Sequence, residues 1–137
     1  MKSYIQPNQE AIANFNKENN LDSPIVMLNL LRFKKQADYS KLSAIKPDET
    51  LTGEQAYHLY MKYTQPILQK LGAEVVYLGK SSAYLIGPTE ETWDMVLLVK
   101  YATIQKFYDL IQDPTYLKTA GHRSAAVEDS RLLPMKG

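Results

Sequence analysis

Two uninterrupted apolar runs dominate the pattern of hydrophobic and polar positions along the chain. Residues 93–101, WDMVLLVKY, hold five consecutive apolar residues from Met95 to Val99, and residues 25–33, IVMLNLLRF, form a second run of this kind. Both runs contain β-branched residues and are too short for a buried helix. This pattern predicts two central strands that are covered on both faces.

Capping residues and apolar spacing predict two helices in the first half of the chain. A proline at the first turn begins a helix over residues 7–18. Thr52 and Gln55 form a capping box that begins a second helix over residues 52–71. Pro66 lies inside this helix and removes one backbone hydrogen bond, so we expect a kink or a break there.

The second half of the chain predicts two strands and two helices around the central run already described. Residues 73–79 and 83–87 are apolar stretches around residues 80–82, and they form one long bent strand or two short strands with a bulge. Thr103 and Asp113 cap two helices, and residues 130–135 form a last strand. Residues 34–51 are polar and aperiodic, which indicates a lid over a pocket or, more often, a solvated excursion.

The order of these elements predicts the fold class. It runs strand, helix, strand, and then repeats once, which is the split βαβ plan. We therefore predict an α+β protein with the ferredoxin-like fold, in which a four-stranded antiparallel sheet carries helices on one face. The first and third strands are expected at the centre, parallel to each other. Residues 1–137 form a single domain, with a helical extension over residues 1–22 and a long loop over residues 34–51.

Composition narrows the range of partners. The 16 basic and 15 acidic residues nearly balance, which argues against nucleic acid or an anionic membrane as a partner. The chain has no cysteine, which excludes disulfides and thiolate chemistry and fits a reducing compartment. No apolar run approaches a signal peptide or a membrane span, so we expect a cytoplasmic protein. Ten tyrosines suit interfaces and partly polar pockets.

Short motifs spread over residues 25 to 135 carry a family resemblance through their order and spacing. The motifs are Asn29 to Phe33, Leu85-Ile86-Gly87, Trp93-Asp94, Tyr101, Asp113 to Tyr116, Arg123 and Asp129 to Leu132. Together they resemble the domain of unknown function 1330 family, within the dimeric α/β barrel superfamily. The resemblance implies a ferredoxin-like fold and homodimers whose sheets pack face to face, and it implies no established reaction.

One haem-degrading branch of that superfamily offers a further comparison. It uses an Asn on its first strand, a Trp on its third strand and an iron-binding His on the following helix. Asn29 and Trp93 can be likened to the first two residues. The helix after Trp93, residues 103–112, contains no histidine, and this departure argues against haem chemistry.

Three polar residues are the candidates for catalysis: Asn29, Asp94 and His122. Asn29 lies inside an apolar strand, where it either orients a ligand or bonds to the backbone as a satisfied core amide. Asp94 opens the other central strand and could act as a general base or accept from Arg123 or His122. A structural ion pair or a solvated strand end is the commoner role for such an Asp.

The predicted ligand-binding residues are Asn29, Tyr60, Tyr63, Trp93 and Arg123. Together with Tyr57, the two tyrosines form a stripe spaced by three. This stripe presents hydroxyls to a cavity or, more often, forms core or dimer surface. The indole is more often core than a stacking platform. The Arg123 guanidinium could bind an acidic ligand through its planar fork, or tie its helix to a nearby carboxylate.

These observations favour a small-molecule-binding homodimer, with cofactor-free catalysis on an aromatic or polyketide-like acid as its enzymatic form. The alternative is a non-enzymatic structural homodimer, and a weaker alternative is an activity like that of haem-degrading monooxygenases. These alternatives leave open whether the protein is an enzyme. We predict no cofactor and no metal, because the two histidines are far apart in the sequence and no carboxylate cluster joins them.

Overall fold

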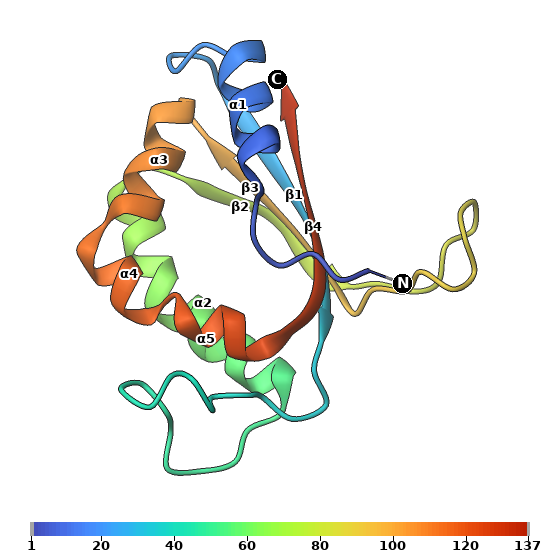
Figure 1. Ribbon diagram of the computed structural model, residues 1–137. Coiled ribbons are helices and arrows are strands. Elements are labelled where there is room, and N and C mark those ends of the chain that lie inside the picture. The colour runs from blue at the N-terminus through green and yellow to red at the C-terminus, as the bar shows by residue number, and fades with distance from the viewer. Residues whose placement is uncertain (1, 137) are drawn as a thin grey trace.

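The computed structural model describes residues 2–136, which form one sheet with its strands in the order β2-β3-β1-β4 (Figure 1). The predicted α+β class and ferredoxin-like arrangement are confirmed. The strands and helices have the following bounds: α1 Gln9–Glu18, β1 Ile25–Phe33, α2 Gly53–Lys70, β2 Glu74–Lys80, β3 Met95–Tyr101, α3 Ile104–Gln112, α4 Pro114–Thr119, α5 Gly121–Ala126 and β4 Val127–Lys136.

The two central strands are β1 and β3, as expected, but their expected parallel orientation was wrong. All three strand pairings are antiparallel, with Leu28 opposite Leu98 in the central pair and opposite Leu133 in the β1–β4 pair. The reason is the split βαβ plan itself. Each strand-helix-strand unit returns in its starting direction and leaves a gap of one strand, and the strand that fills this gap belongs to the other unit and runs the opposite way.

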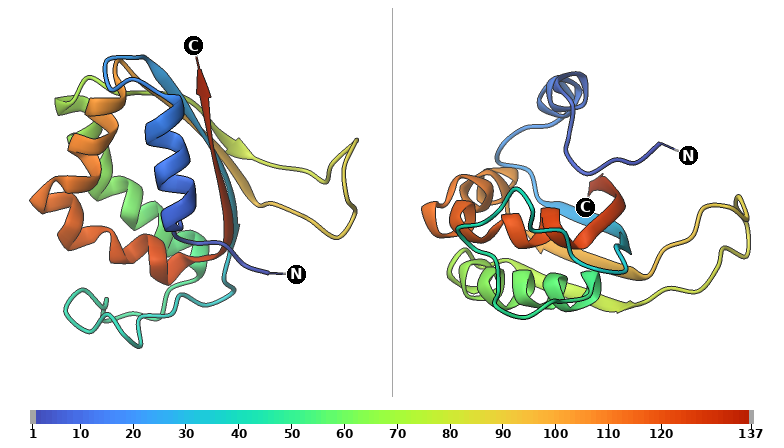
Figure 2. Two further views of the ribbon diagram at one scale, coloured as in Figure 1. Left: turned by 45° about the horizontal axis from the view of Figure 1, so that its top comes forward. Right: turned by 60° about the horizontal axis from the view of Figure 1, so that its bottom comes forward.

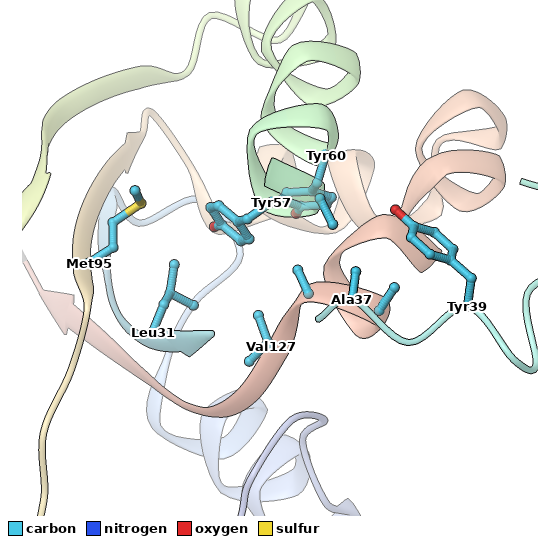
Figure 3. Close-up of a cluster of buried hydrophobic side chains, with 10 residues drawn as sticks. Leu31, Ala37, Tyr39, Tyr57, Tyr60, Met95 and Val127 are labelled. Atoms are coloured by element: carbon cyan, nitrogen blue, oxygen red, sulfur yellow. The ribbon is translucent and has the colours of Figure 1, made fainter. Parts of the chain in front are cut away.

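Helices α2 to α5 cover one face of the sheet (Figures 1 and 2). Their buried side chains meet alternate residues of the strands in two clusters. One cluster packs Leu31, Tyr57 and Val127 together (Figure 3), and the other includes Met27 and Ile104. Because side chains alternate along a strand, this face takes every second residue of the central strands.

The opposite face of the sheet is mostly apolar, with Lys100 and Arg131 among its residues, and the chain itself covers it only in part. In β3 the alternating residues Val96 and Leu98 are half-buried, so cover on both faces is not achieved within one chain. We call the following residues on this side the apolar face: Val26, Leu28, Leu30, Val96, Leu98, Leu133 and Met135. Such a face is expensive to leave in water.

Helix α2 begins at the predicted capping box. The Thr52 hydroxyl accepts from the Gln55 backbone N–H at 3.1 Å, and the Gln55 side chain accepts from the Thr52 backbone N–H at 2.9 Å. The helix continues through Pro66 to Lys70, so no break occurs there. Gly72 follows in the left-handed region with φ 73°, which ends the helix at low steric cost.

The predicted strand over residues 83–87 was wrong. Strand β2 ends at Lys80. Residues 81–92 form an extended connection, here called the arm, which projects outward on the side of the sheet that faces away from the helices (Figures 1 and 2). Leu85 and Ile86 are 100% and 93% exposed at its tip. The apolar residues of this stretch predicted a strand, but no neighbouring strand pairs with them.

The segment 34–51 contains no helix or strand, yet it is not a fully solvated excursion. Its backbone bonds to α5 through the Asp38 N–H and the Ala125 carbonyl at 2.9 Å. Ala37 and Tyr39 are buried in the cluster beneath it. The segment therefore covers the end of the helical layer near α5.

Candidate functional site

Four tyrosines gather between the helices and the sheet, and we call them the tyrosine cluster: Tyr57 and Tyr60 from α2, Tyr101 from β3 and Tyr116 from α4. The rings of Tyr57 and Tyr60 lie 5.2 Å apart, and those of Tyr60 and Tyr116 lie 6.0 Å apart. Tyr101 is within electrostatic range of Tyr57 and Tyr116. Figure 3 shows the Tyr57 ring reaching from α2 towards Leu31 and Met95.

The hydroxyls of this cluster are not all satisfied. The hydroxyls of Tyr60 and Tyr116 share a hydrogen bond of 2.8 Å, whereas those of Tyr57 and Tyr101 bond to no group within residues 2–136. In the same residues Thr64 Oγ1 is the one fully enclosed side-chain polar atom without a partner. The Tyr57 and Tyr101 hydroxyls therefore each touch accessible space, although their rings are buried.

Burial raises the pKa of Tyr57, Tyr60 and Tyr101 well above the usual value of a phenol. The low-dielectric surroundings disfavour the phenolate, and for Tyr57 the nearby Arg123 charge opposes this effect only in part. The three side chains are thus neutral near pH 7. They can donate or accept hydrogen bonds there, but they cannot serve as bases.

Arg123 on α5 carries a half-buried positive charge next to this cluster. Its Nη1 donates to the Ile5 carbonyl at 2.9 Å, and its Nη2 donates to Ser130 Oγ at 3.3 Å. No carboxylate among residues 2–136 forms an ion pair with it. The expected alternative, in which Arg123 ties its helix to an acidic side chain, is not observed.

Asn29 lies on the helical face of β1, in line with Leu31. Its Nδ2 donates to the Leu97 carbonyl across the central pair at 3.2 Å, with a longer contact to Met27 at 3.4 Å. Its Oδ1 accepts no hydrogen bond from residues 2–136. The amide nitrogen therefore has a structural role, whereas the amide oxygen is free to accept a hydrogen bond from a ligand.

Trp93 and Asp94 lie away from the cluster, at the beginning of β3. The Trp93 indole donates to the Tyr84 hydroxyl at 2.7 Å and stacks on the Arg131 guanidinium at 4.9 Å. Asp94 is exposed and accepts from the Phe33 backbone N–H at 2.8 Å. Asp94 thus has neither Arg123 nor His122 as its partner, contrary to the pairing considered from the sequence.

His122 and Tyr63 form a third, separate group between α2, α5 and the segment 34–51. The His122 ring stacks on Tyr63 at 5.6 Å, and its Nδ1 lies 2.7 Å from the Tyr39 hydroxyl. Burial lowers the pKa of His122, because desolvation disfavours the imidazolium. Tyr63 is 42% exposed, since the helical period makes Thr64, rather than Tyr63, follow Tyr60 on the buried face.

The structure brings Tyr60 and Arg123 together and places Asn29 on the same, helical side of the sheet. Tyr63, Trp93, Asp94 and His122 lie in other groups. Sequence reasoning missed Tyr101 and Tyr116, which come from two other elements. It named Tyr57 only as part of the stripe on its helix. The sequence signal for this cluster was the high tyrosine content, and composition does not show which rings pack together.

Two hollows of the surface lie away from the tyrosine cluster. One, of about 440 Å³, lies between α1 and α3 and includes Phe15 and Tyr108 in its lining. Another, of about 450 Å³, lies between the segment 34–51 and α2 and includes His58. Neither is lined by a predicted site residue, so a ligand at the tyrosine cluster would have to widen the accessible space there.

The two residues that were likened to the haem-degrading branch, Asn29 and Trp93, do not meet in the structure. Helix α3 has no histidine, and Trp93 stacks on arginines of the face opposite to Asn29. Within residues 2–136 there is no group of three or more His, Cys, Asp and Glu side chains that could hold a metal ion. No helix in that part of the chain is long and apolar enough to cross a membrane.

These features define the class: a ferredoxin-like α+β protein with an arginine and neutral tyrosines between sheet and helices. No known family model matches the chain, and no curated protein does. The RPA0582 protein of unknown function from Rhodopseudomonas palustris is 39% identical, with a TM-score of 0.84, over 99% of this chain and 98% of that chain. This chain belongs to the family of the RPA0582 protein.

Two other solved structures are similar to this chain. The methylated RPA0582 protein is 38% identical, with a TM-score of 0.86, over 100% of this chain and 96% of that chain. The hydroxynitrile lyase from Passiflora edulis is 9% identical, with a TM-score of 0.55, over 85% of this chain and 94% of that chain. At that identity the second likeness shows the fold alone.

Proposed function

We propose that this protein is a homodimer that binds a small organic acid, aromatic or polyketide-like, between its sheet and its helices. The observation that carries the proposal is Arg123, a half-buried cation without a carboxylate partner among residues 2–136. A partly desolvated charge is costly without a counter-charge. An anionic ligand supplies that charge and pairs with the guanidinium fork.

The neighbouring side chains complement such a ligand. The unpartnered hydroxyls of Tyr57 and Tyr101 supply hydrogen bonds, and the open Oδ1 of Asn29 accepts one. The tyrosine rings provide flat apolar surface for an aromatic body. A ligand with a carboxylate at one end and a hydroxylated ring therefore matches the chemistry of the site.

Binding is favoured over catalysis at this site. The raised pKa values of Tyr57, Tyr60 and Tyr101 remove them as bases near neutral pH. Two of the catalytic candidates, Asp94 and His122, lie in other groups. A cofactor-free reaction there would need a base from outside the tyrosine cluster.

The homodimer part of the proposal is supported by the apolar face. A second copy, packed face to face, removes this surface from water in both chains at once. The face is built from the two central strands and β4, so it spans most of the sheet. Light scattering at micromolar concentration is expected to give about twice the chain mass of 15.6 kDa, and a value near 15.6 kDa would contradict the dimer.

The alternative is a structural homodimer without a ligand. Two observations favour it: the Asn29 amide nitrogen is already bonded to Leu97, and neither clear surface hollow lies at the tyrosine cluster. Membership of the domain of unknown function 1330 family and a cytoplasmic location also belong to the proposal. They rest on the motif resemblance and on the absence of cysteine.

A matched ligand panel distinguishes the two functions. Benzoate, 4-hydroxybenzoate and salicylate are compared with their neutral amides by thermal shift and calorimetry. Acids that raise the melting temperature while the amides do not would support the site. Arg123→Leu should abolish the shift, whereas Lys106→Leu, which removes an exposed charge on α3, should preserve it. Equal responses to acids and amides would contradict an anion site.

A further inference from the structure

The arm is much longer than its connection requires. Strands β2 and β3 are antiparallel neighbours, and such strands are commonly joined by two to five residues. Here residues 81–92 leave the sheet and extend to the side opposite the helices (Figures 1 and 2). An extension of this kind in a compact fold needs a reason beyond chain closure.

Side-chain bonds hold the base of the arm in one conformation. The Tyr84 hydroxyl donates to Glu91 Oε2 at 2.5 Å and accepts from the Trp93 indole at 2.7 Å. Glu91 Oε1 also forms an ion pair of 3.3 Å with Arg131 on β4. These bonds fix the arm to the sheet from both of its ends, so its tip is presented at a defined position.

The tip presents two adjacent aliphatic side chains to water. Leu85 and Ile86 are 100% and 93% exposed, and Gly87 turns the chain directly after them with φ 155°. Single exposed apolar residues are ordinary, but two neighbours on a braced projection form a ready contact point. Their burial requires another molecule, because no other part of residues 2–136 covers them.

A second copy of this chain is the occupant that the structure favours. The arm leaves the sheet on the same side as the apolar face, so a copy that docks on that face also meets the arm. In a two-fold dimer each arm reaches the other protomer, which doubles the gain from each tip residue. The tip and the apolar face then form one continuous interface.

We propose that the arm crosses the dimer and packs Leu85 and Ile86 on the second protomer, beside the face-to-face contact. This inference rests on the homodimer in the proposed function and adds a contact that the sheets alone do not provide. The arm is thus a clamp between protomers, and it is separate from the Arg123 site on the helical side of the sheet.

The test measures the dimer dissociation constant by sedimentation velocity over a dilution series. Leu85→Asp and Ile86→Asp should each raise it at least about tenfold, because burial of one such side chain is worth at least a factor of ten. Leu117→Asp on α4, which is also exposed at 62%, is the matched control and should leave it unchanged. Unchanged Trp93 fluorescence and thermal melts of the separated monomers would show that the fold is retained.

A labelling experiment gives an independent readout. Because the chain has no cysteine, Ile86→Cys accepts a single polarity-sensitive dye, whose emission should shift to the blue in the dimer and return on dilution. Wild-type affinity in both Asp variants, or a dye that stays in water in the dimer, would overturn the clamp and leave the homodimer intact. A monomeric wild type would overturn both, while the ligand panel would still test Arg123 separately.

Discussion

Arg123 and Arg131 lie on either side of the beginning of β4, the first on α5 and the second within the strand, yet their surroundings are opposite. Arg131 forms ion pairs with Asp129 at 2.7 Å and Glu91 at 3.3 Å, and its guanidinium stacks between the rings of Tyr4 and Trp93, at 4.9 Å from each. Arg123 contacts only neutral oxygen atoms. Arg131 is thus fully paired with carboxylates and has a structural role, whereas Arg123 has no counter-charge and can pair with an anionic ligand.

The difference shows why residue type alone does not identify a site. Both arginines are partly buried, and both are close to β4. The deciding quantity is the balance of charge around each one, because a paired guanidinium has little to gain from a ligand whereas an unpaired one has much.

The largest effect on stability is expected at Asp129, the buried partner of Arg131. Its buried carboxylate accepts from the Tyr4 N–H at 2.8 Å and pairs with Arg131 and Arg32. Asp129→Asn leaves these cations without their buried counter-charge and should lower the free energy of unfolding by about 3–5 kcal/mol in urea melts. Glu128→Gln is the control, since Glu128 is an exposed partner of Arg32, and should change it by less than about 1 kcal/mol.

The same carboxyl group predicts an acid limit to stability. Burial alone would raise the pKa of Asp129, but the hydrogen bonds from Tyr4 and Arg131 outweigh it and hold the pKa below its usual value. The folded state thus binds this proton less readily than the unfolded state. The contribution is present above about pH 4 and lost as pH falls through the folded-state pKa, and it should be missing in Asp129→Asn.

The direct comparison of the two arginines should give the next largest effect. Arg131→Leu removes the closest cation from buried Asp129 and should cost about 2–4 kcal/mol. Arg123→Leu removes two hydrogen bonds to neutral groups and should cost about 1 kcal/mol, while abolishing acid binding. Equal losses of stability in urea melts would break the distinction between a structural and a ligand-binding arginine.

Asn29 sharpens the same distinction within a single side chain. If its open oxygen serves a ligand, Asn29→Ala should reduce acid binding in calorimetry and lower the free energy of unfolding by less than about 1 kcal/mol. If its bond to the Leu97 carbonyl is the main role, the loss should be about 1–3 kcal/mol with no change in binding. The second result would assign the residue to the scaffold.

His122 offers the smallest effect, on the same helix as Arg123. It packs against Tyr39 and Tyr63, with no carboxylate paired to it among residues 2–136. Because burial lowers the pKa of His122 below that of the unfolded chain, protonation favours unfolding. Stability should therefore decline as pH falls below about 6.5. His122→Phe should flatten this part of the stability profile, and an unchanged profile would contradict the assignment.

Local signals predicted much of the fold. The apolar run of β1 matches its observed bounds, Ile25–Phe33, and the cap at Thr52 begins α2 as expected. The same kind of signal failed for residues 83–87, because strand formation depends on a neighbour to pair with, and the orientation of β1 against β3 was wrong because it depends on topology.

The candidate site was less predictable, for a physical reason. Tyr60 and Arg123, two of the predicted site residues, lie in one region, but the tyrosine cluster there draws on α2, β3 and α4. Tyr63 was misplaced because a spacing of three drifts off the buried face of a helix with 3.6 residues per turn. The unpaired state of Arg123 depends on every charge around it, and no motif encodes it.

The pairing of β4 with β1 has a consequence for how the molecule folds. Residues 127–136 complete one side of the central strand, residues 25–33, and the Tyr4 carbonyl bonds to Ser130 on the same strand. These partners are about a hundred residues apart, and such distant contacts slow folding. During synthesis β1 and the segment around Tyr4 are made first and stay without their partner until β4 is available. The surroundings of Arg123 are therefore assembled late.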